Sequence, residues 1–263
     1  MTIPDELIER LRGVRTVGAI TGAGISAESG IQTYRGKGGI YDDPEDGEKT
    51  VEALSGPTLL SDPDRTWRAV GQLARQAVGA RPNPAHHALV ALEDKADQFV
   101  LLTQNVDGLH QLAGSRNVID IHGSIHEAAC LSCHRVVRFE PDELASIERT
   151  PKCERCQGKL RPNAVLFGEL LPTEKIQRIH DEFHHRHPDL VLVAGTSAMF
   201  PYISQPVEIA HDAGKLTIEI NPEPTLLSDR VDYSLRGKAG DYLPLITEGV
   251  TGPISDSRRL SRR

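Results

Sequence analysis

Short runs of apolar residues alternate with segments of helical periodicity along most of the chain. Residues 190–194 (LVLVA) have the continuous apolar character of a buried strand, whereas residues 85–92 (AHHALVAL), which follow two prolines, have the spacing of a helix. Strands separated by helices predict a parallel, doubly wound sheet of the Rossmann-like α/β class. The expected strands are residues 14–20, 98–103, 118–122, 190–194 and 216–220, and residues 231–235 and 243–246 would close the domain.

All four cysteines lie in one stretch that interrupts this alternation. They form two Cys-x-x-Cys pairs, with 19 residues between Cys133 and Cys153. This spacing is typical of a tetrahedral zinc site, whereas four free buried thiols would not explain the pairing. We therefore expect a small zinc-ribbon domain at residues 127–162, inserted into an α/β domain made of residues 1–126 and 163–250. The metal ligands would be Cys130, Cys133, Cys153 and Cys156.

Two further stretches show neither pattern. Residues 36–57 are rich in proline, glycine and charge, which predicts a long flexible loop. Residues 251–263 end in the basic sequence SRRLSRR and are expected to be a disordered tail.

Composition narrows the class of protein. The 263 residues are 38% hydrophobic and 25% charged, which is ordinary for a globular protein. The net charge of −7 argues against non-specific nucleic-acid binding and would suit a cationic partner such as a lysine-rich protein segment. There is no apolar run of membrane-spanning length and no signal-peptide pattern at the N-terminus, so we expect a cytoplasmic protein without membrane association.

A glycine-rich turn follows the first expected strand. Gly22-Ala23-Gly24 allows the backbone to approach a pyrophosphate, and Ala27 completes a loose G-x-G-x-x-G/A pattern. This signal is weak by itself, because a tight structural turn needs the same residues. The acidic residue of a dinucleotide-binding dehydrogenase is also missing from a second strand, since Asp42 and Asp43 fall in the expected loop. An ordinary dehydrogenase site is therefore not predicted.

Polar residues gather after four of the expected strands. Thr103-Gln104-Asn105-Val106-Asp107 follows one strand and His122 ends another, and their side chains are suited to a carboxamide and a ribose. Gly195-Thr196-Ser197 and Asn221-Pro222-Glu223 follow two more. Ligands of open α/β sheets bind at the carboxyl ends of the strands, so these four clusters predict one cleft.

Taken together, these segments resemble the sirtuin family of NAD-dependent protein deacylases. The resemblance runs from about residue 13 to 246, through GAGISAESGI, TYRG, TQNVDGLH, IHGS, the paired cysteines, VLFGE, GTS and INPEP in that order. It implies an NAD-binding α/β domain, a small zinc domain, and an acyl-lysine peptide bound in the cleft between them.

The resemblance also implies roles for individual residues. His122 would be the general base, with Asn105 and Asp107 as the other catalytic residues. Val165, Leu166, Phe167, Gly168 and Glu169 would form a strand along which the peptide backbone pairs, and Phe167 with His122 would wall the acyl-lysine tunnel. The residues that would contact NAD are Gly22, Ala23, Gly24, Ser26, Thr33, Tyr34, Arg35, Gln104, Asn105, Asp107, Gly195, Thr196, Ser197, Asn221, Pro222, Glu223 and Ala239.

The implied reaction transfers the acyl group from lysine to ADP-ribose. The acyl oxygen attacks the ribose as nicotinamide leaves, and a ribose hydroxyl activated by His122 then attacks the resulting imidate carbon. An imidazole suits this step because its ordinary pKa near 6.5 leaves it substantially neutral at physiological pH. The products would be nicotinamide, the free lysine and O-acyl-ADP-ribose.

Zinc would be structural, because four thiolates leave no open coordination position. The protein is expected to be a monomer.

Departures from the family pattern bear on the substrate. Members that prefer succinyl-lysine or malonyl-lysine carry a tyrosine and an arginine that align with Val70 and Leu73. Neither residue can bind a carboxylate, so a neutral acyl group, acetyl first, is expected. Tyr34 replaces a usual phenylalanine, and Leu166 replaces a frequent tryptophan.

Two other functions use the same motifs. An ADP-ribosyltransferase or NAD hydrolase would lack the requirement for acyl-lysine, and the intact His122 and VLFGE segment count against it. A non-catalytic NAD-sensing or zinc-ribbon interaction module would bind cofactor without turnover.

The histidines of the HHRHP segment at residues 184–188 suggest a metal, but a solvated helix end explains them better.

Overall fold

The computed structural model describes residues 2–34, 39–40 and 44–252. Its larger sheet has six strands, all parallel, in the order β3-β2-β1-β7-β8-β9. This confirms the predicted doubly wound class. The strands are β1 (Thr16–Thr21), β2 (Gln98–Thr103), β3 (Val118–Asp120), β7 (Leu190–Ala194), β8 (Leu216–Ile220) and β9 (Tyr233–Leu235).

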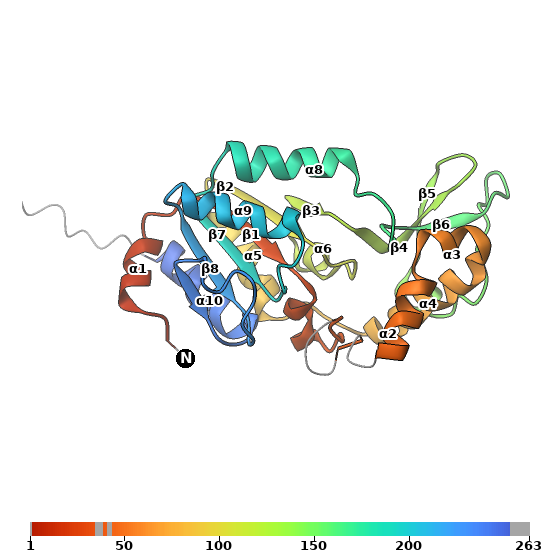
Figure 1. Ribbon diagram of the computed structural model, residues 1–263, viewed down its shortest axis with the longest axis horizontal. Coiled ribbons are helices and arrows are strands. Elements are labelled where there is room, and N and C mark those ends of the chain that lie inside the picture. Colours follow the sequence, from red (N-terminus) through yellow and green to blue (C-terminus); the bar gives the residue numbers. More distant parts are fainter. Residues whose placement is uncertain (1, 35–38, 41–43, 253–263) are drawn as a thin grey trace, which may run out of the picture.

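Helices cover both faces of this sheet (Figure 1). Leu190 and Leu192 of β7 belong to the core beneath α1 (Asp5–Leu11), α5 (Pro84–Lys95) and α10 (Ala239–Thr251). Val191 and Val193 belong to the opposite core, beneath α8 (Thr173–Ile179), the π-helix η2 (His180–His185) and α9 (Pro201–Asp212). Alternate residues of one strand thus enter different cores, so both faces of the strand must be apolar.

A second, smaller lobe contains the cysteines. Its antiparallel sheet has the order β5-β4-β6, formed by β4 (Gly123–Cys130), β5 (Val136–Arg138) and β6 (Leu160–Ala164). Figure 1 places this sheet beside the orange helices α2 (Pro44–Ala53), α3 (Gly56–Ser61) and α4 (Pro63–Ala77). The remaining helices are α6 (Leu109–Ala113) and α7 (Pro141–Ala145).

One hydrophobic core joins these helices to the small sheet. The fully buried Trp67 of α4 packs in it together with Cys130, Cys153 and Leu160. The indole Nε1 of Trp67 donates a hydrogen bond of 3.0 Å to the carbonyl of Leu160. The core of the small lobe therefore extends well beyond residues 127–162, because α4 supplies its largest side chain.

The structure differs from the sequence expectation within residues 36–57. Helix α2 occupies residues 44–53, where we expected a flexible loop. The helix buries Gly47 and Ala53, and Arg65 of α4 forms an ion pair of 2.6 Å with Glu52. With so few apolar residues, this segment shows only a weak helical periodicity in its sequence. The helix is supported by contacts with α4, which comes later in the chain. Residues 36–38 and 41–43 of the expected loop, and 253–263 of the expected tail, lie outside the described residues.

Strand limits follow the prediction closely. Strands β2, β7 and β8 have the expected bounds. Strand β1 begins two residues later than expected, because Val14 still bonds to Leu11 of the preceding helix. Helix α10 is longer than the segment 243–246 recognised from sequence. In the described part of the chain, no helix is both long and apolar enough to span a membrane.

Candidate active site

The turn after β1 packs tightly against the turn after β7. The amide of Gly24 donates a hydrogen bond of 2.8 Å to the carbonyl of Gly195. A β-carbon at Gly24 would lie 2.7 Å from the Cα atom of Gly195, and Gly195 itself has a φ of +64°. Glycine is required at both positions, by close approach at Gly24 and by backbone conformation at Gly195. The chain continues as a 3₁₀ helix, η1 (Ala23–Ser29).

Three of the predicted polar residues meet at the carboxyl edge of the sheet. The hydroxyl of Ser26 donates a 2.7 Å hydrogen bond to the carboxylate of Asp107, and the amide nitrogen of Asn105 donates a 3.1 Å bond to that hydroxyl. The other Asp107 oxygen accepts the backbone N–H of Leu109 at 2.9 Å. Burial raises the pKa of Asp107, although these hydrogen bonds oppose the shift. The resulting network holds the Asp107 carboxylate in a fixed position.

A second set of bonds joins three strand-end clusters. The side-chain amide of Gln104 donates a 2.7 Å hydrogen bond to the Thr196 hydroxyl. The side-chain amide of Asn221 donates a 2.9 Å bond to the Thr196 carbonyl. Residues from the ends of β2, β7 and β8 therefore form one continuous surface, as the sequence predicted.

Two carboxylates that the sequence analysis did not single out support this surface. Glu28 of η1 accepts the amide of Gly240 at 2.9 Å, next to Ala239 at the start of α10. The buried Glu219 of β8 accepts hydrogen bonds from Ser228 at 2.7 Å and from Ser234 at 2.6 Å. Burial opposes the ionisation of Glu219, but these hydroxyls and Arg236 keep its pKa below the ordinary value. Glu219 could have been recognised from the sequence, because it is the acidic residue inside the otherwise apolar strand LTIEI.

His122 lies half-buried just after β3, with both ring nitrogens engaged. Its Nδ1 atom is 2.9 Å from the carbonyl oxygen of Gln104, and its Nε2 atom is 2.9 Å from the hydroxyl of Tyr202. A carbonyl only accepts, so Nδ1 carries the proton and Nε2 offers its lone pair. Burial lowers the pKa of His122, which favours this neutral form. Sequence gave no sign of Tyr202, which is 80 residues away from His122.

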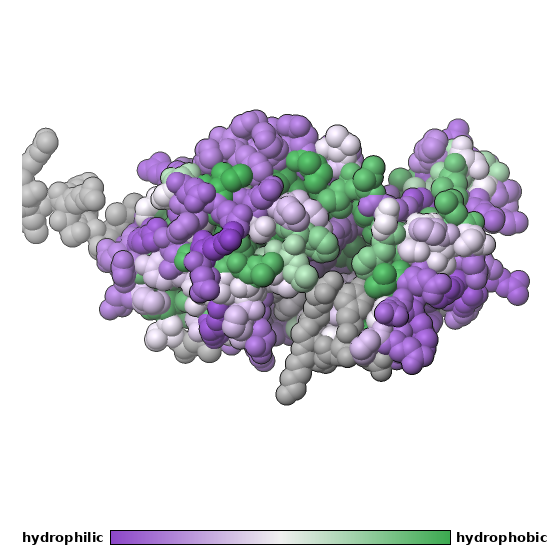
Figure 2. All heavy atoms as spheres, viewed as in Figure 1, coloured by the Kyte–Doolittle hydropathy of each residue, from purple (hydrophilic) through white to green (hydrophobic). Residues whose placement is uncertain are grey.

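A small cavity of about 40 Å³ opens between the two lobes beside Ser26, Asn105 and Asp107. Figure 2 shows apolar side chains exposed between the large lobe and the small lobe, and Ile31, Leu73 and Ile125 are among the apolar residues that line the cavity. Polar groups therefore converge on a hollow with apolar surroundings, which is the usual form of a small-molecule site. Among the residues that line the cavity are Ala23, Ser26, Tyr34, Leu73, Asn105 and Asp107.

The segment expected to pair with a peptide is not a regular strand. Strand β6 ends at Ala164, and residues 165–169 continue as irregular chain with a single bridge to Ser55. Phe167 donates its amide to Leu54 and accepts the amide of Gly56. The expectation of a regular strand at residues 165–169 is therefore corrected here, because the backbone of Phe167 pairs with the short segment between α2 and α3.

The side chains of this segment divide into buried and exposed groups. Glu169 accepts two hydrogen bonds from the Arg161 guanidinium, of 2.9 and 2.7 Å, and one of 2.9 Å from the amide of Leu166. Gly168 has a φ of +83°, which forms the turn between them. The side chain of Phe167 is left 41% exposed beside the cleft. Glu169 thus orders the segment, and Phe167 is the residue presented outward.

The four cysteines lie together, as the sequence predicted. Their sulfur atoms all lie within 4.8 Å of one another, with Cys130 3.4 Å from Cys156 and Cys133 3.7 Å from Cys153. A zinc ion about 2.3 Å from four tetrahedral sulfurs requires sulfurs about 3.8 Å apart, so the cluster fits zinc closely. The amides of Cys133 and Ser132 point at the Cys130 sulfur and help to lower its pKa to about 6, which favours the thiolate.

Several predicted contacts lie on the surface or beyond the described chain. Ser197, Pro222 and Glu223 are exposed, and the carbonyl of Thr33 accepts the amide of Ile40 at 2.9 Å. Arg35 lies outside the described residues, so its predicted contact with NAD stays a prediction.

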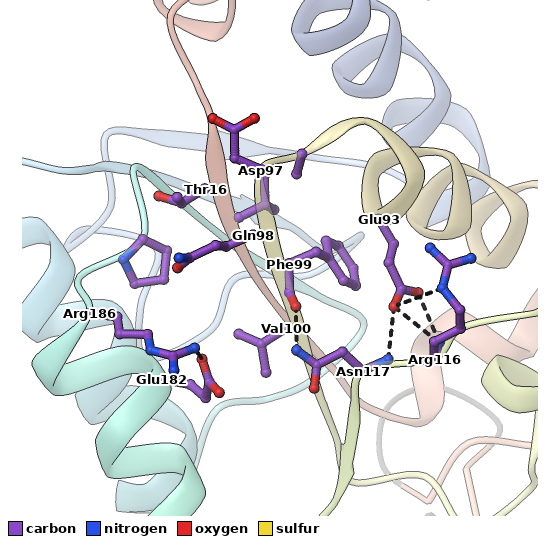
Figure 3. Close-up of a pocket in the computed structure, with 13 residues that line it drawn as sticks. Thr16, Glu93, Asp97, Gln98, Phe99, Val100, Arg116, Asn117, Glu182 and Arg186 are labelled. Atoms are coloured by element: carbon purple, nitrogen blue, oxygen red, sulfur yellow. Dashed lines mark hydrogen bonds and ion pairs between the residues drawn. The ribbon is translucent and has the colours of Figure 1, made fainter.

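A larger hollow of about 330 Å³ lies at the opposite edge of the sheet (Figure 3). Thr16 and Gln98, which line it, are the first residues of β1 and β2. Four of its charged residues form ion pairs with one another: Arg116 with Glu93 at 3.8 Å, and Arg186 with Glu182 at 2.7 Å. Ligands of parallel sheets bind at the carboxyl edge, so this hollow is not the candidate site.

The sequence and the fold both match one family. The profile described as the Sir2 family matches residues 22–201. The "NAD-dependent protein deacylase 2" of Pseudomonas aeruginosa is 41% identical over 92% of this chain and 95% of its own length.

Solved structures of Sir2 proteins share the fold. A mutant Sir2 homologue in complex with ADP-ribose superposes with a TM-score of 0.83 at 38% identity, covering 94% of this chain and 96% of that one. A Sir2 mutant with a deacetylated p53 peptide and an O-acetyl-ADP-ribose has a TM-score of 0.80 at 28% identity, covering 92% and 96%.

Proposed function

Since the chain belongs to the Sir2 family, we propose that it is an NAD-dependent protein deacylase that removes neutral acyl groups, acetyl first, from lysine side chains. The observation that carries the proposal is the network of Ser26, Asn105 and Asp107 at the carboxyl edge of the sheet. His122 is tied to the same strand end, because its Nδ1 donates to the carbonyl of Gln104. The substrate is an acylated protein or peptide, in keeping with the relative that was solved with a deacetylated peptide.

His122 supplies the proton acceptor of this reaction. NAD supplies the ADP-ribose that receives the acyl group, with nicotinamide as the leaving group. The proton lost by a ribose hydroxyl ends on Nε2 of His122, while the Nδ1–H of His122 stays bonded to the Gln104 carbonyl, which stabilises the imidazolium. The lowered pKa of His122 keeps the imidazole ready to accept that proton at neutral pH.

The surrounding residues position NAD. Asn105 and Asp107 are held by Ser26 and serve the nicotinamide and its ribose. The close turns at Gly24 and Gly195 bring the backbone to the phosphates, and the surface around Thr196, Asn221 and Ala239 receives the adenosine half. Phe167 and His122 wall the tunnel for the acyl-lysine, where a neutral acyl group costs little to desolvate.

The zinc in this proposal is structural. Cys130, Cys133, Cys153 and Cys156 would hold it, and four protein ligands leave no position for a substrate. The ion would fix the end of the small lobe on which Trp67 packs. The cytoplasmic location and the monomeric state stay predictions.

Mass spectrometry of an acetyl-lysine peptide incubated with the purified protein tests the function. Deacetylation should require NAD and yield equal amounts of nicotinamide and O-acetyl-ADP-ribose, and a His122→Ala variant should lose it. Nicotinamide release that does not depend on the peptide would instead identify an NAD hydrolase or ADP-ribosyltransferase.

A further inference from the structure

The hydroxyl of Tyr202 occupies the only free lone pair of His122. Its oxygen lies 2.9 Å from Nε2, while Nδ1 is committed to the Gln104 carbonyl. An imidazole nitrogen has one lone pair in the plane of its ring and accepts one hydrogen bond there. A ribose hydroxyl therefore cannot donate directly to Nε2 while Tyr202 stays in place.

Tyr202 is fixed in this position by its place at the start of α9 and by two sets of contacts. It is the second residue of α9, directly after Pro201 at the start of the helix. Its ring is stacked on Phe200, with 5.3 Å between the ring centroids and 13° between the planes. It also packs against the core beneath α8 and α9. Moving the ring away from His122 would break these contacts, whereas transferring a proton through its hydroxyl breaks none.

The hydroxyl has the chemistry for such a transfer. Burial raises the pKa of Tyr202 to about 12, so the group stays protonated and donates to Nε2. The phenol oxygen has lone pairs of its own with which it can accept a second hydrogen bond. The edge-to-face arrangement of Tyr202 and His122, with 6.0 Å between centroids, leaves the hydroxyl directed at the imidazole edge.

We propose that Tyr202 is a second acid–base residue, which relays the proton of the attacking ribose hydroxyl to His122. The ribose O–H bond breaks as its proton passes to the Tyr202 oxygen, and the Tyr202 proton passes to Nε2. The ribose oxygen keeps the electron pair and attacks the imidate carbon. Tyr202 ends neutral and His122 ends as the imidazolium, so charge and protons balance. This inference rests on the proposed deacylase function.

A Tyr202→Phe variant tests the relay because it keeps the ring and removes only the hydroxyl. In a single turnover with NAD and acetyl-lysine peptide, nicotinamide release precedes the base-dependent step and should keep the wild-type rate. Formation of O-acetyl-ADP-ribose should slow by about 100-fold or more, in keeping with the usual contribution of a positioned acid–base group. Tyr233→Phe is the matched control. Tyr233 is on strand β9, where its ring lies against the guanidinium of Arg10 and away from His122.

Each outcome decides the proposal. Product formation in Tyr202→Phe that equals or exceeds the wild-type rate would overturn it, and a faster rate would show that the hydroxyl competes with substrate. A proton inventory on the unmodified protein, in mixtures of H₂O and D₂O, should curve because two protons move together, and a linear plot would also overturn the relay. If wild-type protein released no nicotinamide with acetyl-lysine peptide, the proposed function itself would fail.

Discussion

The Ser26 hydroxyl and the Asp107 carboxylate form a 2.7 Å hydrogen bond between two segments that are 81 residues apart in the chain. The bond joins the 3₁₀ helix after β1 to the turn after β2, and the same hydroxyl accepts the side-chain amide of Asn105. Ser26 is itself fully buried. One small side chain thus orders the two polar residues assigned to the nicotinamide half of NAD.

A Ser26→Ala substitution should therefore weaken NAD use more than it weakens the fold. Without the Ser26 hydroxyl, the Asp107 carboxylate loses a hydrogen-bond donor and the Asn105 side-chain amide loses an acceptor. Leaving such buried groups unpaired costs about 1–3 kcal/mol. We expect kcat/KM for NAD to fall by about 10-fold or more, by the same energy scale. Steady-state kinetics with varied NAD would measure it.

Ser61→Ala is the matched control for this substitution. Ser61 donates only to the carbonyl of Pro57 within its own helix, on the exposed surface of α3. Wild-type kinetics in both variants would contradict a role for the Ser26–Asp107 bond in the site.

Two buried histidines predict a loss of stability in mild acid. Burial lowers the pKa of His86 from 6.5 to about 4 and that of His110 from 6.5 to about 3. Between pH 6.5 and about 4 the unfolded chain therefore binds protons that the folded chain does not. Each such group removes about 1.4 kcal/mol of unfolding free energy per pH unit in that window, so stability should fall steeply as pH decreases.

Chemical denaturation at several pH values measures this dependence. A His110→Gln variant should show a shallower decline of unfolding free energy between pH 6.5 and 4, whatever its stability at pH 7. The exposed His185 provides the control, and His185→Gln should keep the wild-type slope. Equal slopes in wild type and His110→Gln would rule out His110 as a source of the acid sensitivity.

Local sequence was sufficient for the sheet and for most of the site. The run LVLVA defines β7 without help from distant residues, because a strand buried on both faces must be apolar throughout. Cys130 and its partners were likewise recognisable from spacing alone. Residues at strand ends, such as Gln104 and Thr196, could be placed together because parallel strands bring their carboxyl ends to one edge.

Features that depend on contacts between distant segments were not predictable. Helix α2 has few apolar residues and is supported by α4, so its own sequence resembled a loop. The backbone of Phe167 pairs with Leu54 and Gly56, more than 100 residues earlier, and local sequence gives no sign of this pairing. Tyr202 reaches His122 only because α9 begins at Pro201, and no spacing rule links the two residues.

Removal of zinc should unfold the core of the small lobe, and the only tryptophan of the chain reports on it. Trp67 is fully buried beside Cys130 and Cys153, with its ring 5.9 Å from that of Phe139. Structural zinc sites contribute on the order of 10–16 kcal/mol to the folding of small peptides. Without the ion, the small lobe should therefore lose its folded core. A strong chelator, or Cys130→Ser, should shift Trp67 fluorescence to longer wavelength and abolish activity.

Elemental analysis completes this test. Wild-type protein should contain about one zinc per chain, as four ligands to a single ion require. Ser132→Ala, which leaves every cysteine in place, should keep both the metal and the fluorescence. A Cys130→Ser protein that retained zinc and an unshifted spectrum would argue against the Cys₄ site.

The acyl preference should follow from the apolar side chains of α4. Leu73 lines the small cavity beside Asn105 and Asp107, and Val70 is buried one turn earlier. A succinyl carboxylate there would be desolvated without a cationic partner, which costs several kcal/mol, whereas an acetyl group has no such charge. We expect kcat/KM for acetyl-lysine peptide to exceed that for the succinyl peptide by about 100-fold or more, as a penalty of that size implies.

A Leu73→Arg substitution would provide the missing cation at the cavity. The ratio of succinyl to acetyl turnover should rise by about 10-fold, since one partly buried charge pair is worth on the order of 1–2 kcal/mol. Leu73→Met, which changes shape without charge, should leave the ratio near that of wild type. Faster turnover of succinyl-lysine by the unmodified protein would instead show that a cation from another segment reaches the acyl group, and that Leu73 does not set the preference.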